Sequence, residues 1–374
     1  MRVGLGQIGG CMADNFRHKL VVRGMLMFVV GGEPEEFERV KPLPKGMGNN
    51  LCQMLRTSFL RSSHALRRTR ALSTVASKDQ VGVIGLGQMG GRMADNLRKH
   101  GHKLVVCDPV PANVQKQVDQ GGAVAAATPA EVAEQCDTIV TMLPSTAIVE
   151  SVYLGDGGVH EALRSEHLLL DSSTIDPIFT KKLSTELHAR GATFVDAPVS
   201  GGVAGAQNGT LTFMVGGEPD EFERVKPLLK AMGKNLVYCG GSSTGQVAKL
   251  CNNLALAIQM ASVAEAMNLG TTLGIDPKIL KNIMDTSTSS CWSTLVNHPY
   301  PGMMENVPSS NNYDGGFAVA LHRKDLGLAM DCAKQAEVSI PLTCQVHQIY
   351  NMMVSSGHGK KDFSYLLPYL KNGK

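Results

Sequence analysis

The sequence predicts an α/β fold in which a doubly wound, mostly parallel sheet is followed by an all-α C-terminal domain. Short apolar strands alternate with helical segments from about residue 79, an alternation typical of a parallel sheet. From Gly245 onward the strand signals stop and only helical patterns remain. At 374 residues the chain also exceeds what one hydrophobic core usually serves. We therefore expect two folded domains, at residues 79–242 and 243–374.

Composition limits the kinds of partner that the protein can have. The formal net charge of +3 is small and much of the excess lies near the N-terminus, which argues against a nucleic-acid-binding protein. No Cys-x-x-Cys pair and no His/Cys cluster with zinc-ligand spacing occurs, so no metal site is expected. No run approaches the roughly eighteen uninterrupted apolar residues of a membrane span. A small molecule is therefore the expected partner, without nucleic acid or membrane.

Residues 1–53 contain broken copies of sequence that recurs later in the chain. Residues 4–15 repeat residues 85–96 with two substitutions, but the copy omits everything that corresponds to residues 107–211. A fragment that keeps a glycine-rich turn without its neighbouring strands cannot bury its apolar faces. We interpret residues 1–53 as an aberrant partial duplicate that does not fold, with natural translation starting at Met54.

Residues 54–78 have the composition of a targeting segment. They are rich in Arg, Ser, Thr and Leu, and the first acidic residue after Met54 is Asp79. Such a segment can form a cationic amphipathic helix, which is the profile of a mitochondrial transit peptide. The alternatives are a basic linker or an arm that binds anionic lipid or nucleic acid. We favour the transit peptide, because a complete α/β domain follows at once, and we expect the mature protein in the mitochondrial matrix.

A glycine-rich turn joins the first buried strand, Val81–Ile84, to a helix. The residues of this turn are Gly85, Leu86, Gly87, Gln88, Met89 and Gly90. With Asp108 after the second strand, it forms a G-x-G-x-x-G fingerprint with an acidic residue about 20 positions on. Free N–H groups at the helix start attract phosphates. Asp108 can accept hydrogen bonds from ribose hydroxyls and would repel a 2′-phosphate, so the sequence predicts a Rossmann-type domain that prefers NAD to NADP.

Further candidate residues follow the later strands. Ligands of such sheets bind at the carboxyl ends of the strands, where Leu143, Pro144 and Thr174 stand. These residues are candidates to border the nicotinamide, although Pro144 is equally explained as a strand terminator. The turn of Ser200, Gly201 and Gly202 offers N–H groups and a hydroxyl that could hold a carboxylate.

Lys249 and Asn253 are the candidate catalytic residues. They lie four positions apart in a predicted helix, which places both side chains on one face. An amine that can exchange a proton then stands one turn from an amide that can orient a substrate oxygen. A single lysine in a helix is normally a solvated charge, but the neighbours of Lys249 are mostly apolar. Together with the fingerprint, this pair predicts hydride transfer at a hydroxyl-bearing carbon.

Seven blocks that span essentially all of residues 80–374 resemble the β-hydroxyacid dehydrogenase family. The blocks are Gly85–Gly90, Asp171–Pro177, Asp196–Gly202, Gly245–Asn253, Ala264–Gly270, Val307–Gly316 and Lys324–Ala329. The resemblance implies NAD as the cofactor and oxidation of 3-hydroxyisobutyrate to methylmalonate semialdehyde in valine catabolism. It also implies Lys249 as the catalytic residue and Lys324 as a residue near the nicotinamide end of the cofactor.

The resemblance leaves two alternatives and one departure. A related semialdehyde or glyoxylate reductase would share these site residues, and a non-catalytic cofactor-binding relative would share the fold. The departure is Ser290, which stands where the family usually has an arginine, and the segment 293–299 after it also differs. If that arginine holds the substrate or its loop, affinity or specificity is altered here. We also expect a homo-oligomer, a dimer or tetramer, because one small helical domain can hardly cover the long apolar helix from Gln246 to about Leu269.

Overall fold

The computed structural model describes residues 18–22, 25–29 and 80–372, and the chain divides into two units, residues 1–72 and 73–374. In the first unit two strands are described, β1 (His18–Val22) and β2 (Met25–Val29), which pair antiparallel. The rest of the predicted duplicate and the whole predicted transit peptide lie outside the described residues. A two-stranded hairpin alone is at best marginally stable in water. Both interpretations of the N-terminal region therefore stay predictions.

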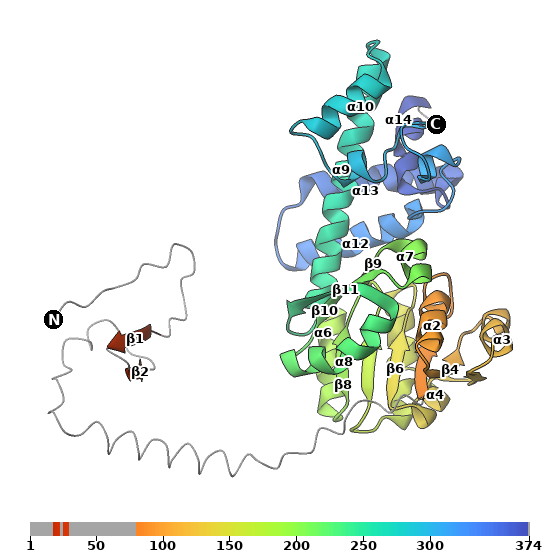
Figure 1. Ribbon diagram of the computed structural model, residues 1–374, viewed down its shortest axis with the longest axis vertical. Helices are drawn as coiled ribbons and strands as arrows, with labels where there is room; N and C mark the ends of the chain where they lie inside the picture. The colour runs from red at the N-terminus through yellow and green to blue at the C-terminus, as the bar shows by residue number, and fades with distance from the viewer. Residues whose placement is uncertain (1–17, 23–24, 30–79, 373–374) are drawn as a thin grey trace. The chain divides into compact units, whose positions relative to one another are not determined.

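The second unit begins with one nine-stranded sheet in the order β11-β10-β8-β7-β6-β3-β4-β5, with β9 paired to β10 (Figure 1). Its strands are β3 (Gln80–Ile84), β4 (Lys103–Cys107), β5 (Ala123–Ala125), β6 (Thr138–Thr141), β7 (Leu168–Asp171), β8 (Thr193–Asp196), β9 (Val199–Ser200), β10 (Leu211–Gly216) and β11 (Gly233–Gly240). The six neighbouring strands β5, β4, β3, β6, β7 and β8 are parallel to one another, and β10 is antiparallel to β8. From β3 the chain adds β4 and β5 on one side, and it then returns to add β6, β7 and β8 on the other side. Sheets of this kind bind ligands at the point where the strand order changes direction, which here lies between β3 and β6.

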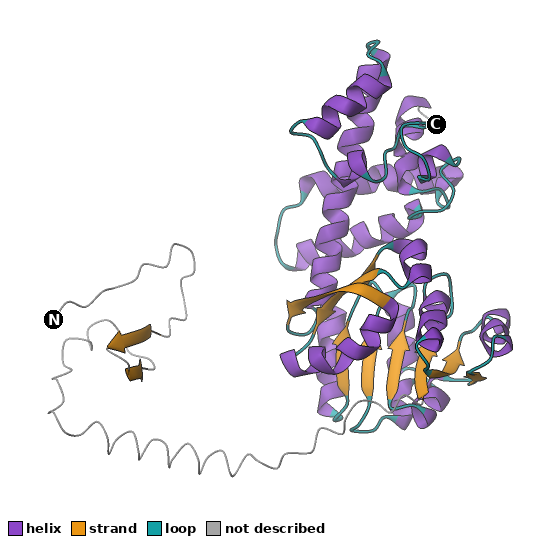
Figure 2. Ribbon diagram, in the orientation of Figure 1, coloured by secondary structure: helices purple, strands orange, loops and turns teal. Residues whose placement is uncertain are grey.

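Helices cover both faces of this sheet (Figure 2). They are α2 (Gly90–Lys99), α3 (Pro111–Asp119), α4 (Pro129–Gln135), α5 (Thr146–Leu154), η2 (Val159–Ala162), α6 (Pro177–Ala189), α7 (Gly202–Asn208) and α8 (Pro219–Met232). Side chains of α2, α7 and α8 form one core and those of α4, α5 and α6 another. Successive strand residues alternate between the two cores, as Leu104 and Val105 do, because a strand points its side chains to opposite faces in turn. The predicted doubly wound sheet is confirmed.

The remaining chain is helical, as predicted. Its elements are α9 (Thr244–Thr272), α10 (Pro277–Thr286), α11 (Trp292–Leu295), η3 (Pro308–Ser310), α12 (Val319–Gln335), α13 (Pro341–Met353), η4 (Val354–His358), η5 (Phe363–Tyr365) and α14 (Leu366–Asn372). The second half of α9 supplies the central side chains of a third core, against which α12, α13 and α14 pack. Helix α9 starts beside the sheet and runs through the helical domain (Figure 1).

Among the described residues, α9 is the one helix long and apolar enough to cross a membrane by length and composition. Its apolar side chains have another use here, since Ala257, Met260, Ala264 and Met267 are fully buried within the helical domain. The apolar composition of α9 is thus explained by its place at the centre of a protein core.

Candidate active site

The glycine-rich turn lies where the carboxyl end of β3 meets the start of α2. Gly85 has a φ of 92°, and a Cβ there would overlap the carbonyl oxygen of Met142 at the end of β6. A Cβ at Gly90 would overlap the carbonyl oxygen of Gly85, so α2 can start this close to the strand only with glycine. Gly87 and Gln88 are exposed, and a Cβ at Gly87 would meet nothing within 4 Å. The tip of the turn is therefore open to a ligand, while its base is packed.

Asp108 is fixed directly beside this turn at the end of β4. One carboxylate oxygen accepts a hydrogen bond of 2.6 Å from the backbone N–H of Leu86. The other accepts from the Val110 N–H at 2.8 Å and from the Asn113 amide at 3.1 Å. The carboxylate is thus held next to the turn by the backbone of the turn itself, where it can meet a ribose and repel a 2′-phosphate.

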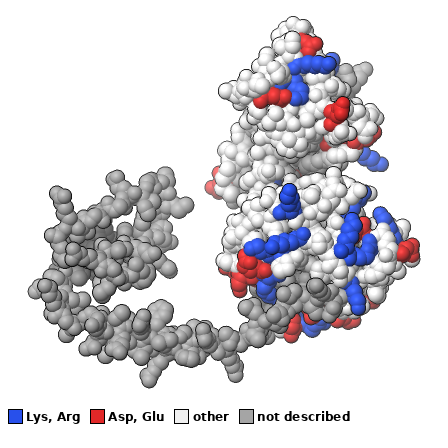
Figure 3. All heavy atoms as spheres, in the orientation of Figure 1, with Lys and Arg blue, Asp and Glu red and all other residues white. Residues whose placement is uncertain are grey.

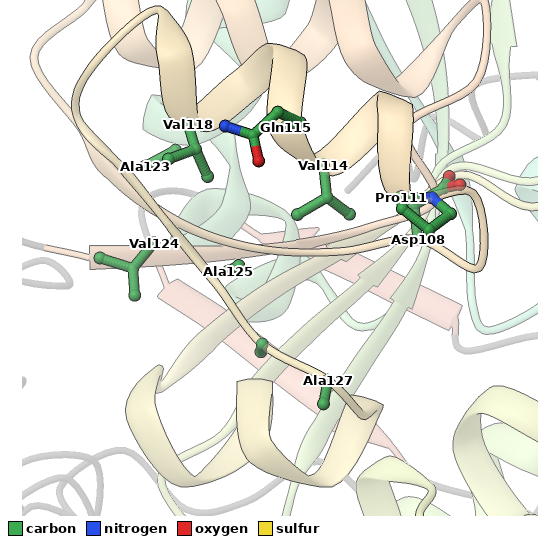
Figure 4. A pocket seen from close by; sticks show the side chains of 10 residues that line it. Asp108, Pro111, Val114, Gln115, Val118, Ala123, Val124, Ala125 and Ala127 are labelled. Carbon is green, nitrogen blue, oxygen red and sulfur yellow. The ribbon is translucent and has the colours of Figure 1, made fainter.

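An apolar pocket of about 600 Å³ adjoins Asp108. Figure 4 shows Asp108 and Pro111 at one end of it, with Val114 and Val118 of α3 on one side and Val124 toward the other end. Apart from Asp108, these lining residues carry no signal in the sequence, because their apolar side chains follow the same pattern as core residues. Their position next to Asp108 makes them candidates to contact a planar ring attached to the ribose.

The strand ends of β6 and β7 are tied to α12 by one lysine. Lys324 donates a hydrogen bond of 2.7 Å to the carbonyl oxygen of Thr174 and one of 3.4 Å to that of Pro144. The backbone of Leu143 is fixed by a hydrogen bond of 2.8 Å from its N–H to the Ser173 hydroxyl. The structure thus brings Leu143, Pro144, Thr174 and Lys324 together, although Lys324 is 150 residues from Thr174 in the sequence.

Lys249 lies on α9 and is 8% exposed. Burial lowers the pKa of its ammonium group because water no longer stabilises the charge. The carboxylate of Asp325 acts in the opposite direction and raises that pKa, and the nearby cation of Lys324 lowers it further. The net direction is downward, which favours a neutral amine able to accept a proton.

Asn253, one turn after Lys249, is held by two residues of α12. Its amide nitrogen donates a hydrogen bond of 2.6 Å to the carboxylate of Asp325, and its backbone carbonyl oxygen lies 3.0 Å from Nε2 of His322. Asp325 also pairs with Lys324 at 3.2 Å. Neither Asp325 nor His322 is among the site residues predicted from the sequence. Asp325 could have been suspected, because it directly follows Lys324 near the start of a predicted helix. Nothing in the sequence pattern marks His322.

The Ser200–Gly202 turn lies between β9 and α7. Gly201 and Gly202 have φ values of 125° and 60° and are exposed, and Ser200 is partly exposed. Figure 1 shows β9 and α7 at the boundary between the sheet domain and the helical domain. Gly201 and Gly202 are therefore accessible at this boundary, and the role of the turn in binding a substrate stays a prediction.

Ser290 lies in the turn between α10 and α11. Its side chain is exposed and its N–H donates to the carbonyl oxygen of Ser287. Helices α10 and α11 contact α9, and α10 is drawn at the end of the helical domain far from the sheet (Figure 1). Trp292, two residues after Ser290, stacks on Phe363, whose ring contacts His322. The effect of Ser290 on the substrate stays a prediction.

A turn open to phosphates beside a fixed carboxylate, together with a buried lysine at the strand ends, defines a nicotinamide-dependent dehydrogenase. Two family descriptions match: residues 80–241 match the NAD binding domain of 6-phosphogluconate dehydrogenase, and residues 243–370 match the NAD-binding domain of NADP-dependent 3-hydroxyisobutyrate dehydrogenase. The chain belongs to the 3-hydroxyisobutyrate dehydrogenase family and is an NAD-dependent oxidoreductase.

Named relatives match this chain over most of their own length. The mitochondrial 3-hydroxyisobutyrate dehydrogenase of Mus musculus is 52% identical over 298 residues, which cover 80% of this chain and 89% of the relative. The Homo sapiens protein of that name is 50% identical, with 80% and 88% covered. Among solved structures, Mycobacterium tuberculosis 3-hydroxyisobutyrate dehydrogenase with L-serine has a TM-score of 0.75 and 34% identity, covering 79% of this chain and 99% of that one.

Proposed function

We propose that this chain oxidises 3-hydroxyisobutyrate to methylmalonate semialdehyde in valine catabolism, with NAD as oxidant and Lys249 as general base. The observation that carries the proposal is the buried Lys249 on the same helix face as Asn253, beside the strand ends of a dinucleotide-binding sheet. Relatives named for this activity share about half of the residues of this chain over the aligned region.

Each part of the proposed cofactor site matches one part of NAD. The exposed turn at Gly87 and Gln88 offers backbone N–H groups to the pyrophosphate, and Asp108 offers its carboxylate to the ribose hydroxyls. The apolar pocket beside Asp108 would hold the adenine, and Lys324 would contact the nicotinamide end. When bound, the nicotinamide supplies the acceptor for the hydride.

The chain's own residues bind and orient the substrate and take its proton. The Ser200–Gly202 turn would hold the carboxylate through its N–H groups and the Ser200 hydroxyl. Asn253, fixed by Asp325, would orient the substrate hydroxyl, and the neutral Nζ of Lys249 would accept the hydroxyl proton. The Mycobacterium tuberculosis relative was solved with L-serine, a molecule that carries both a carboxylate and a 3-hydroxyl group, as the proposed substrate does.

Relatives with about 50% identity are named as mitochondrial, which supports a mitochondrial location for this chain. We place it in the matrix, because the basic segment 54–78 has the composition of a transit peptide. Import of a fusion of residues 54–78 to a reporter, scored by protease protection inside isolated mitochondria with permeabilised outer membranes, tests this location.

A homodimer or tetramer is the proposed assembly. The end of α9 and the following helix α10 expose four large apolar side chains: Leu269 at 63%, Leu273 at 78%, Ile279 at 57% and Ile283 at 48%. The face drawn in Figure 3 carries its basic side chains in separate groups, and much of the helical domain there is uncharged. Since exposed apolar patches mark association sites, a second copy would cover this surface. Light scattering after size exclusion decides between one, two and four chains.

The first experiment measures NADH formation by the purified chain with NAD and (S)-3-hydroxyisobutyrate, L-serine, or other 3-hydroxy acids. Selective turnover of 3-hydroxyisobutyrate is the expected outcome. Turnover of a different 3-hydroxy acid, or reduction of glyoxylate or succinate semialdehyde in the reverse direction, would favour a sister activity. NAD binding without any turnover would favour a non-catalytic relative.

A further inference from the structure

Asp196, the last residue of β8, is completely buried and binds the start of α9. Its Oδ1 accepts a hydrogen bond of 2.7 Å from the N–H of Ser243, and its Oδ2 accepts one of 3.0 Å from the N–H of Gln246. These N–H groups belong to the N-cap residue of α9 and to its first turn, where no backbone partner within the helix exists. Both carboxylate oxygens are therefore used to hold a single turn of helix.

Gln246 and Gly245 dock the same turn onto two further strands. The Gln246 side chain accepts from the N–H of Ile175 at 3.1 Å and donates to the carbonyl oxygen of Ser173 at 2.7 Å. A Cβ at Gly245 would overlap the carbonyl oxygen of Met214 and lie 2.8 Å from Asp196 Oδ2. The first turn of α9 is thus clamped to β8, to the loop after β7 and to β10.

This clamp fixes where the proposed catalytic groups stand. Lys249 follows Gln246 by three residues in a continuous helix, so any tilt of the first turn moves its Nζ. We propose that Asp196 is a positioning residue that sets the place of Lys249 relative to the strand ends, an inference that rests on the proposed role of Lys249. Asp196 also begins the segment that leads to Ser200, so one side chain links the base-bearing helix to the proposed carboxylate-binding turn.

The charge of Asp196 makes this function depend on pH. Burial raises the pKa of its carboxyl to about 7, with a smaller upward effect from Asp171 of β7, while the N–H groups of Ser243 and Gln246 lower it. The charge of this carboxylate also raises the pKa of the Cys239 thiol on β11. Above that pKa both oxygens accept hydrogen bonds. Below it one oxygen carries a proton and no longer accepts freely, so the clamp weakens as the pH falls.

Asp196→Asn tests the proposal because it keeps the shape but leaves one acceptor for two N–H groups. We expect NADH binding to change less than about twofold, and kcat to fall about tenfold or more. The ratio of kcat above and below pH 7 should be smaller in the variant, because the titrating carboxyl is gone. Asp276→Asn is the matched control, since Asp276 caps α10 through the N–H of Lys278 and stays remote from the site; its kcat should be unchanged.

Loss of stability in Asp196→Asn with unchanged kcat and pH dependence would overturn the proposal. If that variant does not fold, Asp196→Ser is the second variant, since its single hydroxyl cannot accept from the N–H groups of both Ser243 and Gln246, and an unchanged kcat there would overturn the proposal equally. If the wild-type chain turns over no 3-hydroxy acid, the proposed function fails separately. The position of Lys249 is then tested by the rate of its reductive methylation, measured as a function of pH. A midpoint of this pH dependence that rises toward the ordinary lysine value in Asp196→Asn supports the positioning role. A midpoint that does not move contradicts it.

Discussion

The two ends of the proposed cofactor site are built in different ways. The adenosine end comes from one continuous stretch, in which the turn Gly85–Gly90 and Asp108 are joined by the hydrogen bond from Leu86 over 22 residues. The proposed catalytic end joins Asn253 to Asp325 over 72 residues and Lys324 to Thr174 over 150. The first end combines a glycine-rich backbone turn with the Asp108 carboxylate, whereas the second combines the buried Lys249 and Asp325 with the partly exposed Lys324.

This difference determines how each end should respond to the substitution of a side chain. Backbone donors at the adenosine end persist when the Asp108 side chain is changed, so a substitution there should weaken NAD binding and leave the chemistry intact. At the proposed catalytic end, Asp325 raises the pKa of Lys249 and Lys324 lowers it, so a change in either residue alters the protonation of Lys249. The following experiments test that contrast.

The largest effect is expected from Lys249→Ala. Loss of the proposed base should lower kcat by about 10²–10⁴-fold, the usual contribution of general acid–base catalysis. NAD affinity should persist, because the adenosine end is untouched. Steady-state NADH formation and NAD titration measure the two quantities, with the exposed Lys278→Ala as control. A folded Lys249→Ala variant with near-normal turnover would remove Lys249 from the mechanism.

Asp108→Asn should affect the other end. Loss of the charged acceptor removes roughly 1.5–3 kcal/mol of hydrogen bonding to the ribose, so kcat/KM for NAD should fall about tenfold or more. The preference for NAD over NADP should shrink as well, since the carboxylate no longer repels a 2′-phosphate. Initial rates with each cofactor measure this. A fall in kcat at saturating NAD, with KM unchanged, would contradict the proposed separation of the two ends.

Lys324→Met should move the pH dependence of kcat. The Lys324 cation lowers the pKa of Lys249, so its removal lets that pKa rise toward the ordinary value. The neutral base then forms at higher pH, and the acid limb of the kcat profile shifts upward. A profile recorded at saturating NAD and substrate checks the shift. An acid limb that stays in place would mean that Lys324 acts only through its hydrogen bonds to the strand ends.

Asp325→Asn should move the same limb in the opposite direction. The Asp325 carboxylate raises the pKa of Lys249, so its neutral replacement lowers that pKa and shifts the acid limb to lower pH. The expected change in kcat at neutral pH is less than about tenfold, because an asparagine still offers an oxygen to Asn253. Equal directions of shift for Asp325→Asn and Lys324→Met would refute the electrostatic account of Lys249.

The smallest effect is expected from removing residues 1–53. A chain that starts at Met54 should match the full chain in kcat and thermal stability, because the site and the three described cores lie in residues 80–372. Peptide mass spectrometry of the native protein provides the complementary observation. Abundant peptides from residues 1–50, or a clear loss of activity on truncation, would show that the duplicate has a role.

The repeated sequence in that region illustrates how context decides structure. The strand β1 repeats the residues of His102–Val106, which form most of β4, yet β1 pairs antiparallel with β2. Strand β4 instead lies parallel between β3 and β5. Identical residues therefore take different partners, because pairing depends on which strands the rest of the chain provides.

The sequence by itself determined the features whose causes are local. Strand and helix periods predicted the fold class, and the glycine spacing with Asp108 predicted the adenosine end, because turn geometry and phosphate binding depend on neighbouring residues. The four-residue spacing of Lys249 and Asn253 likewise predicted their shared helix face.

Only the tertiary structure decided what surrounds that pair. Burial of Lys249, the bond from Asn253 to Asp325, and the capping of α9 by Asp196 all join residues far apart in the chain. A carboxylate looks the same in a sequence whether it is solvated or buried against a helix start. Its energetic role follows from desolvation and from the groups that the fold brings to it, and these exist only once the sheet and α9 have come together.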